Sequence, residues 1–245
     1  MKSCLVIPCY NEENRLKSDQ LLAFLTQSPD FELLLVDDGS QDGTWRVIEA
    51  LAAQNPRAQG LKLEKNQGKA EAVRRGVMKA LENPELQFVG YFDADLATPL
   101  EESHRMLRYF NEQPYYQMIL GSRLRKLGNQ IERRWSRHLL GRLFATAVSQ
   151  ILHLPVYDTQ CGAKLFRAPI ARVLFKERFV SPWFFDVEIL ARHLAQKGSA
   201  NQIFEMPLKI WIHQPGSKLR SSDYLRVPIE LLKIWYHYRK VPGTF

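Results

Sequence analysis

Two acidic side chains, Asp93 and Asp95, follow an apolar run in the stretch FVGYFDADLATP, residues 88–99. Like charges this close repel each other, and each carboxylate loses hydration when it is partly buried. In an extended chain, residues two apart project to the same side, so both carboxylates are expected to face one point. Hard oxygen ligands suit Mg²⁺ or Mn²⁺, especially where substrate phosphates complete the ligand shell. The pair therefore predicts a divalent metal site, with ordinary turn chemistry as the alternative.

Three more polar stretches follow apolar runs or open a predicted helix. PCYNEE brings Asn11 and Glu12 to the end of the first apolar run, and LLLVDDGSQDGT brings Asp37 to the end of the second. Carboxylates at such positions can accept hydrogen bonds from a base ring or ribose hydroxyls. KNQGKAEAVRRG places Gly68 and Lys69 at a helix N-terminus, where free backbone N–H groups favour a base or a phosphate. Together they predict a nucleotide site, although each residue could instead form a turn or a solvated charge.

The first 120 residues alternate short apolar runs with amphipathic stretches. They predict strands over 4–8, 31–38, 60–66, 86–95 and 117–123, with helices over 13–27, 44–53, 68–83 and 100–112. This alternation predicts an α/β fold of right-handed βαβ units around a mostly parallel, twisted sheet flanked by helices. Ligands of such sheets lie at the carboxyl ends of the strands. All the acidic residues named above lie at such ends. Neither GxGxxG nor GxxxxGK[ST] occurs, so the Rossmann and P-loop fingerprints are absent.

The pattern changes after residue 123. We expect helices over 133–152, 168–176, from about residue 185 and over 221–245, with one strand over 203–212. No repeat or low-complexity linker divides the chain, so we predict a single domain over 1–245. Residues 1–122 would form its nucleotide-binding half, 123–220 its acceptor-binding half, and 221–245 a C-terminal amphipathic helix.

Composition narrows the class of protein. With 45% hydrophobic and 24% charged residues, the chain is of ordinary globular type. The three cysteines show no CxxC spacing and no secretory signal is apparent, so we expect reduced thiols in a cytoplasmic protein. No segment approaches the about 18 consecutive apolar residues that a membrane span needs.

The net charge of +8 is unevenly distributed. One basic cluster comprises Arg123, Arg125, Lys126, Arg133, Arg134, Arg137 and Arg142, against Glu132 alone. A second lies between residues 209 and 240. Such clusters suggest an anionic partner, which could be phosphate, nucleic acid or a membrane surface. No nucleic-acid recognition motif appears, so we do not expect a nucleic-acid partner.

In order along the chain, IPCYNEE, LLLVDDGSQDGT, KNQGKAEAVRRG and YFDADLATP resemble the family-two, inverting glycosyltransferases of the GT-A type. GSR (121–123), DTQCGAKLFR (158–167), WFFDVEIL (183–190) and GSKL (216–219) resemble the branch that transfers sugar to polyprenyl phosphates. Within that branch, DTQCG with KLF and the W-x-FD-x-E pattern are most similar to the dolichyl-phosphate glucosyltransferases. The resemblance extends to about residue 220.

The resemblance implies roles for particular residues. The nucleotide, expected to be uridine, would be lined by Pro8, Tyr10, Asn11, Glu12, Asp37, Gly68, Lys69, Asp93 and Ala94. Asp93 and Asp95 would bind Mg²⁺ or Mn²⁺ and through it the diphosphate, and the metal would stabilise the leaving group as a Lewis acid. Mannosyl relatives can add a further metal ligand after the second aspartate. Ala97 stands there in this sequence, so water or another residue would have to serve.

The acceptor would be a polyprenyl phosphate, and the donor UDP-glucose or GDP-mannose. Arg123, together with Arg133 and Arg137 spaced one helical turn apart, could converge on the acceptor phosphate; the alternative is a solvated helix face. Because that phosphate is already anionic, no strong general base is needed. In addition to Asp95, Asp158 is our first choice for a catalytic carboxylate. Further candidates for contacting acceptor or sugar are Gln160, Trp183, Asp186 and Glu188.

Alternatives remain at this stage. The C-terminal stripe of Leu225, Ile229, Leu232 and Trp235, next to basic residues, is typical either of a helix on an anionic membrane surface or of a helix packed on its own domain. The acceptor could instead be a saccharide or another cell-envelope molecule. A nucleotidyltransferase is disfavoured because PCYNEE is not the glycine- and arginine-rich loop expected there. A binder without catalytic activity is disfavoured by the intact Asp93 and Asp95.

Overall fold

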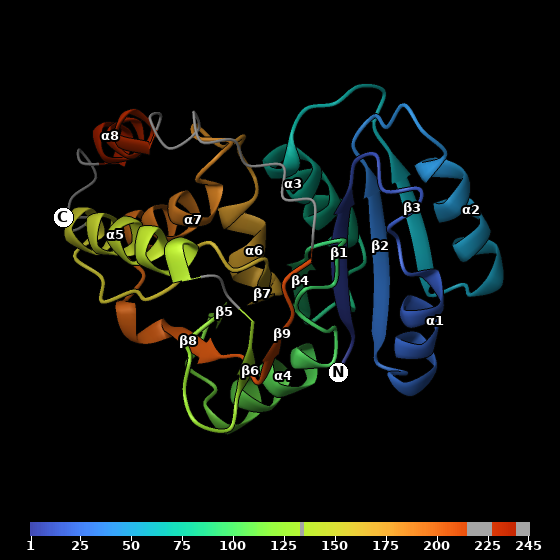
Figure 1. Cartoon of the computed structure of the whole chain (residues 1–245), viewed down its shortest axis with the longest axis horizontal. Helices are drawn as coiled ribbons and strands as arrows, with labels where there is room; N and C mark the ends of the chain where they lie inside the picture. The colour runs from blue at the N-terminus through green and yellow to red at the C-terminus, as the bar shows by residue number, and fades with distance from the viewer. Residues whose placement is uncertain (133–134, 215–226, 239–245) are drawn as a thin grey trace.

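The protein is an α/β structure built on one seven-stranded sheet (Figure 1). The computed structural model describes residues 1–132, 135–214 and 227–238. Its first half contains β1 (Ser3–Cys9), α1 (Ser18–Gln27), β2 (Phe31–Asp37), α2 (Thr44–Gln54), β3 (Ala58–Lys62), α3 (Lys69–Ala80), β4 (Phe88–Phe92), α4 (Glu102–Glu112) and β5 (Met118–Ser122). The remainder contains β6 (Gln130–Ile131), α5 (Trp135–Leu152), β7 (Ala163–Arg167), α6 (Ala168–Leu174), α7 (Phe185–Ala195), the 3-10 turn η1 (Ala200–Gln202), β8 (Ile203–Pro207), β9 (Ile210–Trp211) and α8 (Val227–Tyr238).

The strand order in the sheet is β3-β2-β1-β4-β7-β5-β8. The pairs β1–β2, β1–β4, β2–β3 and β5–β8 are parallel, whereas β7 runs antiparallel between β4 and β5. The predicted α/β class with a mostly parallel sheet is therefore confirmed. Because β7 is inverted, its first residue, Ala163, lies opposite Phe92 at the carboxyl end of β4. The loop that precedes β7 is thereby brought to the edge where β1, β2 and β4 end.

Two apolar cores cover the two faces of the sheet. One contains α3, α5, α6, α7 and α8, and the other contains α1, α2 and α4, as the two groups of helices in Figure 1 show. The central strands are buried from both sides, which explains their unbroken apolar runs, such as LLLV in β2. The helix α8 buries one stripe, Leu231, Ile234 and Tyr238, whereas α7 is buried over nearly its whole length.

Several predicted boundaries were wrong at the ends of elements. The helix predicted over 13–27 begins only at Ser18, because residues 12–16 form a tight turn in which Arg15 N donates to Glu12 O at 2.9 Å. The strand predicted over 60–66 is β3, shifted toward the N-terminus, and the strand predicted over 86–95 ends at Phe92. The run 203–212 forms two strands: β8 joins the main sheet, while β9 pairs with β6 in a separate two-stranded sheet. The strand β7 had not been assigned from the sequence.

The C-terminal helix predicted over 221–245 is described only as α8, since 215–226 and 239–245 lie outside the described residues. Leu225 of the predicted apolar stripe is among those omitted. Ile229 and Leu232 of that stripe are 57% and 58% exposed, and the face that packs inward is the neighbouring one. Within the described part of the chain, no helix combines the length and apolar character that a bilayer span requires.

Candidate active site at the carboxyl edge of the sheet

Asp93 and Asp95 lie in a turn that follows β4. Leu96 N donates to Asp93 O at 3.1 Å, and Leu96 has a φ of 50°. The expectation that the pair projects from extended chain was therefore wrong, because the backbone folds back directly after Phe92. Asp95 Oδ1 accepts a hydrogen bond from Ala97 N at 2.9 Å, which fixes this carboxylate inside the turn.

The two carboxylates nevertheless act on each other. Burial raises the pKa of Asp95, and the charge of Asp93 raises it further, against the opposing charges of Lys69 and Arg15. A divalent cation would relieve this destabilisation of the ionised Asp95. The described residues contain no group of three or more His, Cys, Asp or Glu side chains arranged for a metal. A cation here would therefore take its other ligands from water and phosphate oxygens, as Mg²⁺ and Mn²⁺ commonly do.

Lys69 stands beside this pair at the first position of α3. Its Nζ lies 2.6 Å from Asp93 Oδ1 and 5.9 Å from the ring centre of Phe185. Although loss of water opposes its charge, the carboxylates of Asp93, Asp186 and Asp95 together raise the pKa of Lys69. The side chain remains 42% exposed, so its ammonium stays within reach of an anionic ligand.

The N-terminus of α3 is shaped by Gly68. This residue has a φ of 89°, which favours glycine, and no described atom lies within 4 Å of the place where a Cβ would stand. Asp38 holds the preceding loop, because its carboxylate accepts from Gln67 N and Gly68 N, both at 2.8 Å. Asp38 is thus engaged by the protein's own backbone. The open space beside Gly68 fits a phosphate or base at this helix end.

The β1 and β2 ends are tied together at the same edge. Asn11 has a φ of 51°, and its Oδ1 accepts from Gln41 N at 2.9 Å, so this side chain joins the two loops. Asp37 is fully buried: its Oδ1 accepts from Ser40 N at 3.0 Å, whereas its Oδ2 has no hydrogen-bond partner within the described chain. An unpaired buried carboxylate oxygen is costly, and a donor from a base or ribose would satisfy it.

The other predicted nucleotide residues surround this place. Pro8 pairs in register with Val36 near the end of β1, and Tyr10 follows the strand, half-buried. Glu12 is buried and its N donates to Thr44 Oγ1 at 2.8 Å. Ala94 is buried between the two aspartates. The structure brings these residues to one edge, while their contacts with a nucleotide stay predictions.

Arg123 and Asp158 form a buried, two-pronged ion pair. Arg123 Nε lies 2.6 Å from Asp158 Oδ2 and Nη2 lies 2.7 Å from Oδ1, while the Arg123 backbone N also donates to Oδ2 at 3.0 Å. Burial disfavours the guanidinium charge, but Asp158 outweighs this and raises the pKa of Arg123. Asp158 thus orients Arg123, one of the roles expected for it. Its part in catalysis stays a prediction.

Two further arginines of the predicted phosphate site cannot be placed. Arg133 lies outside the described residues, and Arg137 lies on α5 with its side chain outside them. Their convergence with Arg123 stays a prediction. Gln160 lies two residues after Asp158, and its buried Nε2 has no hydrogen-bond partner in the described chain.

The WFFDVE segment divides between the site and the interior. Asp186 is near enough to Lys69 for its charge to raise the pKa of that lysine, and it accepts hydrogen bonds from Tyr91 OH and from the fully buried Lys164 Nζ. Trp183 is 43% exposed in the loop before α7. Glu188, by contrast, is completely buried in contacts with the protein itself, so the structure does not present it to a sugar or an acceptor.

Lys164 and Gly162 were not singled out from the sequence. A Cβ on Gly162 would lie 1.9 Å from Asp93 Oδ2, so the glycine of DTQCG allows the Asp93 carboxylate to pack directly on the backbone. Asp93 N also donates to Gly162 O at 2.9 Å. For Lys164, the available signal was a lysine within the apolar run AKLF, because a fully buried ammonium requires a carboxylate partner.

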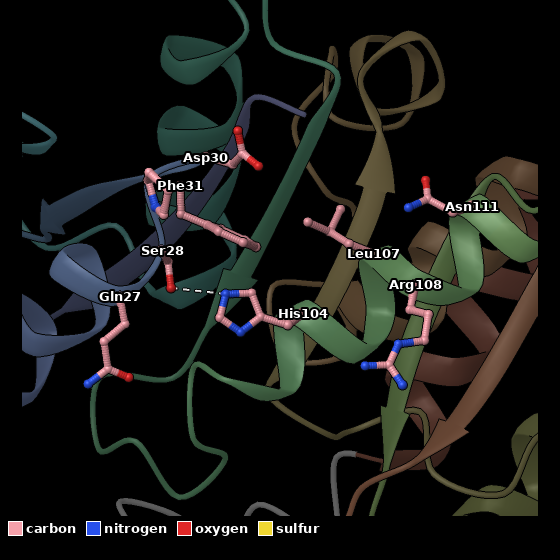
Figure 2. Close-up of a pocket in the computed structure, with 9 residues that line it drawn as sticks. Gln27, Ser28, Asp30, Phe31, His104, Leu107, Arg108 and Asn111 are labelled. Carbon is pink, nitrogen blue, oxygen red and sulfur yellow. Dashed lines mark hydrogen bonds between the residues drawn. The ribbon is translucent and has the colours of Figure 1, made fainter.

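One surface hollow lies away from these residues. It has a volume of about 390 Å³ and is lined by residues from the end of α1, the start of β2 and one face of α4. In Figure 2, His104 reaches across it and forms a 2.9 Å hydrogen bond with Ser28 Oγ. Phe31 opens β2, so this hollow is at the amino edge of the sheet, opposite Asp93 and Asp95. The candidate active site is therefore not this hollow.

Comparison with known proteins supplies the family. Residues 4–175 match the model of the glycosyl transferase family 2. The chain belongs to glycosyl transferase family 2. The dolichyl-phosphate beta-glucosyltransferases of Homo sapiens and Drosophila melanogaster are each 33% identical to it, with alignments that cover 96% of this chain and 75% and 74% of those proteins. The Dictyostelium discoideum protein of the same name is 30% identical, over 96% of this chain and 74% of its own length.

Solved structures agree on the fold of this family 2 transferase. Glucosyl-3-phosphoglycerate synthase from Mycobacterium tuberculosis in complex with uridine diphosphate superposes with a TM-score of 0.67 at 19% identity, over 96% of this chain and 80% of that one. The same enzyme with Mn²⁺, UDP-glucose and phosphoglyceric acid gives 0.66 at 18% identity, over the same shares. The GT-A fold expected from the motifs is thereby confirmed, as is the hexosyltransferase class.

Proposed function

We propose that this protein moves a hexose, glucose, from a UDP-linked donor to a polyprenyl or dolichyl phosphate, with inversion at the anomeric carbon. The observation that carries the proposal is the placement of Asp93, Asp95 and Lys69 together, beside the open N-terminus of α3. Relatives named dolichyl-phosphate beta-glucosyltransferase, at 30–33% identity, support the acceptor and the sugar.

The side chains available as metal ligands fit Mg²⁺ or Mn²⁺. Asp93 and Asp95 supply hard oxygen ligands, and burial together with the charge of Asp93 disfavours the ionised form of Asp95, which a bound cation would stabilise. When bound, the metal would act as a Lewis acid toward the diphosphate. Lys69 would contact the same phosphates, while Asp37 and the residues at the end of β1 would hold the nucleoside.

The chemistry asks little of a general base. An oxygen of the acceptor phosphate attacks the anomeric carbon, the bond from that carbon to the β-phosphate oxygen breaks, and the electron pair leaves with UDP. The attacking oxygen is already ionised at neutral pH, so no proton has to be removed. Arg123, held by Asp158, would attract the acceptor phosphate and keep it in line, with Arg133 and Arg137 as further partners.

The place of action would be a membrane surface, because a polyprenyl phosphate is a lipid. The outward face of α8 carries Ile229, Leu232 and Tyr236, each at least 57% exposed, with the exposed side chain of Lys233 beside them. Aliphatic, aromatic and basic side chains in this combination suit the interface of an anionic bilayer. The same helix packs its other face on the protein, so both expectations for this segment can hold together.

An acceptor panel tests the proposal. The protein is incubated with Mn²⁺ and UDP-glucose labelled in the sugar, and with a short polyprenyl phosphate, a saccharide or 3-phosphoglycerate in separate reactions. We expect label only in the polyprenyl phosphate product, released by mild acid as glucose. Label in the saccharide alone would replace this acceptor by the family 2 alternative.

A further inference from the structure

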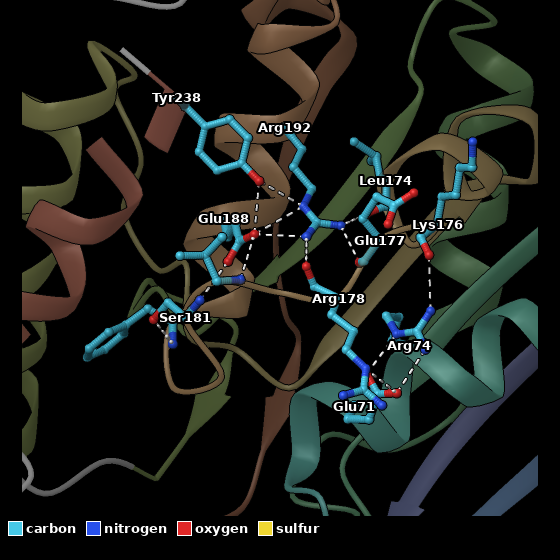
Figure 3. Close-up of polar contacts among 12 residues, drawn as sticks. Glu71, Arg74, Leu174, Lys176, Glu177, Arg178, Ser181, Glu188, Arg192 and Tyr238 are labelled. Carbon is cyan, nitrogen blue, oxygen red and sulfur yellow. Dashed lines mark hydrogen bonds and ion pairs between the residues drawn. The ribbon is translucent and has the colours of Figure 1, made fainter. Parts of the chain in front are cut away.

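The loop between α6 and α7, residues 175–184, is held by the polar contacts drawn in Figure 3. It leads directly into Phe185 and Asp186, which lie next to Lys69. The loop also meets the first two turns of α3: Lys176 O accepts from Arg74 Nη1 at 3.0 Å, and Arg178 Nε lies 3.7 Å from Glu71 Oε1. Glu71 is itself held by Arg74 at 2.7 and 2.8 Å. The position of this loop therefore bears on the nucleotide side of the site.

One end of the loop is held by Arg192 of α7. Its guanidinium donates to the backbone carbonyls of Leu174, Glu177 and Arg178 at 2.7, 2.7 and 2.6 Å. It also lies 4.3 Å from the ring centre of Phe179. Because one nearly buried guanidinium binds all three carbonyls, it fixes the backbone path from the end of α6 into the loop.

The other end is held by Glu188, the partner of Arg192. Glu188 is completely buried and accepts from Val180 N at 3.1 Å and Ser181 N at 2.9 Å, while its Oε1 lies 2.9 Å from Arg192 Nη2. A buried ion pair is stable only where its remaining hydrogen-bonding positions are filled, and here the loop backbone fills them. The pair and the loop therefore order each other.

The C-terminal helix α8 completes this arrangement at two points. Tyr238 OH donates to Glu188 Oε1 at 2.9 Å and accepts from Arg192 Nε at 3.1 Å, as Figure 3 shows. Near the start of α8, Glu230 Oε2 accepts from Ser181 Oγ at 2.8 Å. Tyr238 therefore contacts the ion pair that holds the loop, and Glu230 contacts the loop itself.

We propose that Glu188, Arg192 and Tyr238 are positioning residues for donor binding, and that α8 acts as an internal clamp on the 175–184 loop. The clamp keeps Phe185 and Asp186 against Lys69, and keeps the loop against the first two turns of α3. This assigns Glu188 a positioning role in place of a sugar contact. The proposal rests on the proposed function, because it concerns the UDP-sugar site of that function.

The test compares Tyr238→Phe with Tyr236→Phe. The first removes only the hydroxyl that bonds Glu188 and Arg192; the second alters a tyrosine 58% exposed on the same helix. UDP affinity with Mn²⁺ is measured by calorimetry, amide hydrogen exchange is measured over the loop, and thermal unfolding checks the fold. For Tyr238→Phe we expect faster amide exchange at Val180 and Ser181. We also expect UDP affinity about three- to ten-fold weaker, because only part of the free energy of a hydrogen bond to charged groups is transmitted to the UDP site. Tyr236→Phe should match the wild type in UDP affinity and in amide exchange over the loop.

Ser181→Ala supplies a second variant, since it breaks the other α8 contact without touching the ion pair. Faster loop exchange with unchanged UDP affinity, in both variants, would overturn the proposal, and so would unchanged exchange in both. In the wild type, absence of UDP binding would reject the proposed function itself, and the positioning role would fall with it. UDP binding by the wild type, equal in all variants, would reject the positioning role alone.

Discussion

At the scale of single residues, the hydrogen-bond partners of each aspartate indicate whether it supports the protein's own structure or is available to a ligand. Asp38 uses both oxygens on the loop before α3, and Asp158 uses both on Arg123. Asp37, in contrast, keeps a buried oxygen that accepts no hydrogen bond from any described group. Asp93 and Asp95 share one turn beside Lys69. Neighbouring aspartates thus differ in role, because the protein's own groups already fill the hydrogen-bonding positions of some and leave those of others open.

Asp158→Asn should lower turnover far more than it weakens donor binding. Asparagine replaces one of the two acceptor oxygens that Arg123 uses with an NH₂ donor, and it removes the charge that offsets the guanidinium. We expect kcat to fall about 100-fold, with the dissociation constant of UDP changed by less than about two-fold. Steady-state kinetics and calorimetry measure the two effects, with Asp19→Asn on the surface of α1 as control. Equal activity in the variant would reject a catalytic or orienting role for Asp158.

At the scale of elements, the antiparallel strand β7 is the feature that completes the site. It brings Gly162 and the DTQC segment to the end of β4, where Asp93 packs on the glycine backbone. The sequence predicted the parallel strands and the edge where they end, since apolar runs followed by acids mark them. It did not predict β7, because AKLF with its internal lysine is too short and too polar to be recognised without its partners Asp186 and Tyr91.

Gly162→Ala tests this packing. The added methyl group would overlap the Asp93 carboxylate, which would have to leave its position. We expect Mn²⁺-dependent UDP binding to weaken at least about ten-fold, which corresponds to about 1.4 kcal/mol. Gly128→Ala is the control: Gly128 has a φ of 84° but open space around it, so alanine there should cost stability without affecting binding. Unchanged binding in Gly162→Ala would show that Asp93 tolerates displacement.

The outward face of α8 gives a second prediction at this scale. Wild-type protein should float with vesicles that contain anionic lipid and remain unbound with phosphatidylcholine alone. Replacing Ile229 and Leu232 by serine should abolish flotation without lowering the melting temperature, because both side chains are more than half exposed. Flotation of the double variant equal to that of the wild type would assign membrane contact, if any, to another surface.

At the scale of the whole molecule, buried ionisable groups tie stability to pH. His193 is almost fully buried in α7, and burial lowers its pKa despite the contact of its ring nitrogen with Ser199 O. The unfolded chain therefore binds a proton at a higher pH than the folded one. This contribution favours the fold above about pH 6.5 and is lost progressively as the pH falls toward the lowered pKa.

Urea unfolding between pH 7.5 and pH 5.5 measures this dependence. We expect the wild type to lose stability as the pH falls, and His193→Gln to lose less, since glutamine can still donate to Ser199 O but binds no proton. An identical pH dependence in both proteins would show that other groups control acid stability. Nothing in the sequence distinguishes His193 from the other five histidines, because its burial follows from the packing of α7 in the folded chain.

The central claim is that the carboxyl edge of the sheet transfers glucose from UDP to a polyprenyl phosphate through Asp93 and Asp95. The most direct measurement is the initial rate at which label passes from UDP-glucose into a short polyprenyl phosphate, with and without Mn²⁺, in the wild type and in Asp95→Asn. We predict transfer that requires the metal and falls at least about 100-fold in the variant. Transfer that persists in Asp95→Asn, or that proceeds equally without divalent metal, would contradict this account.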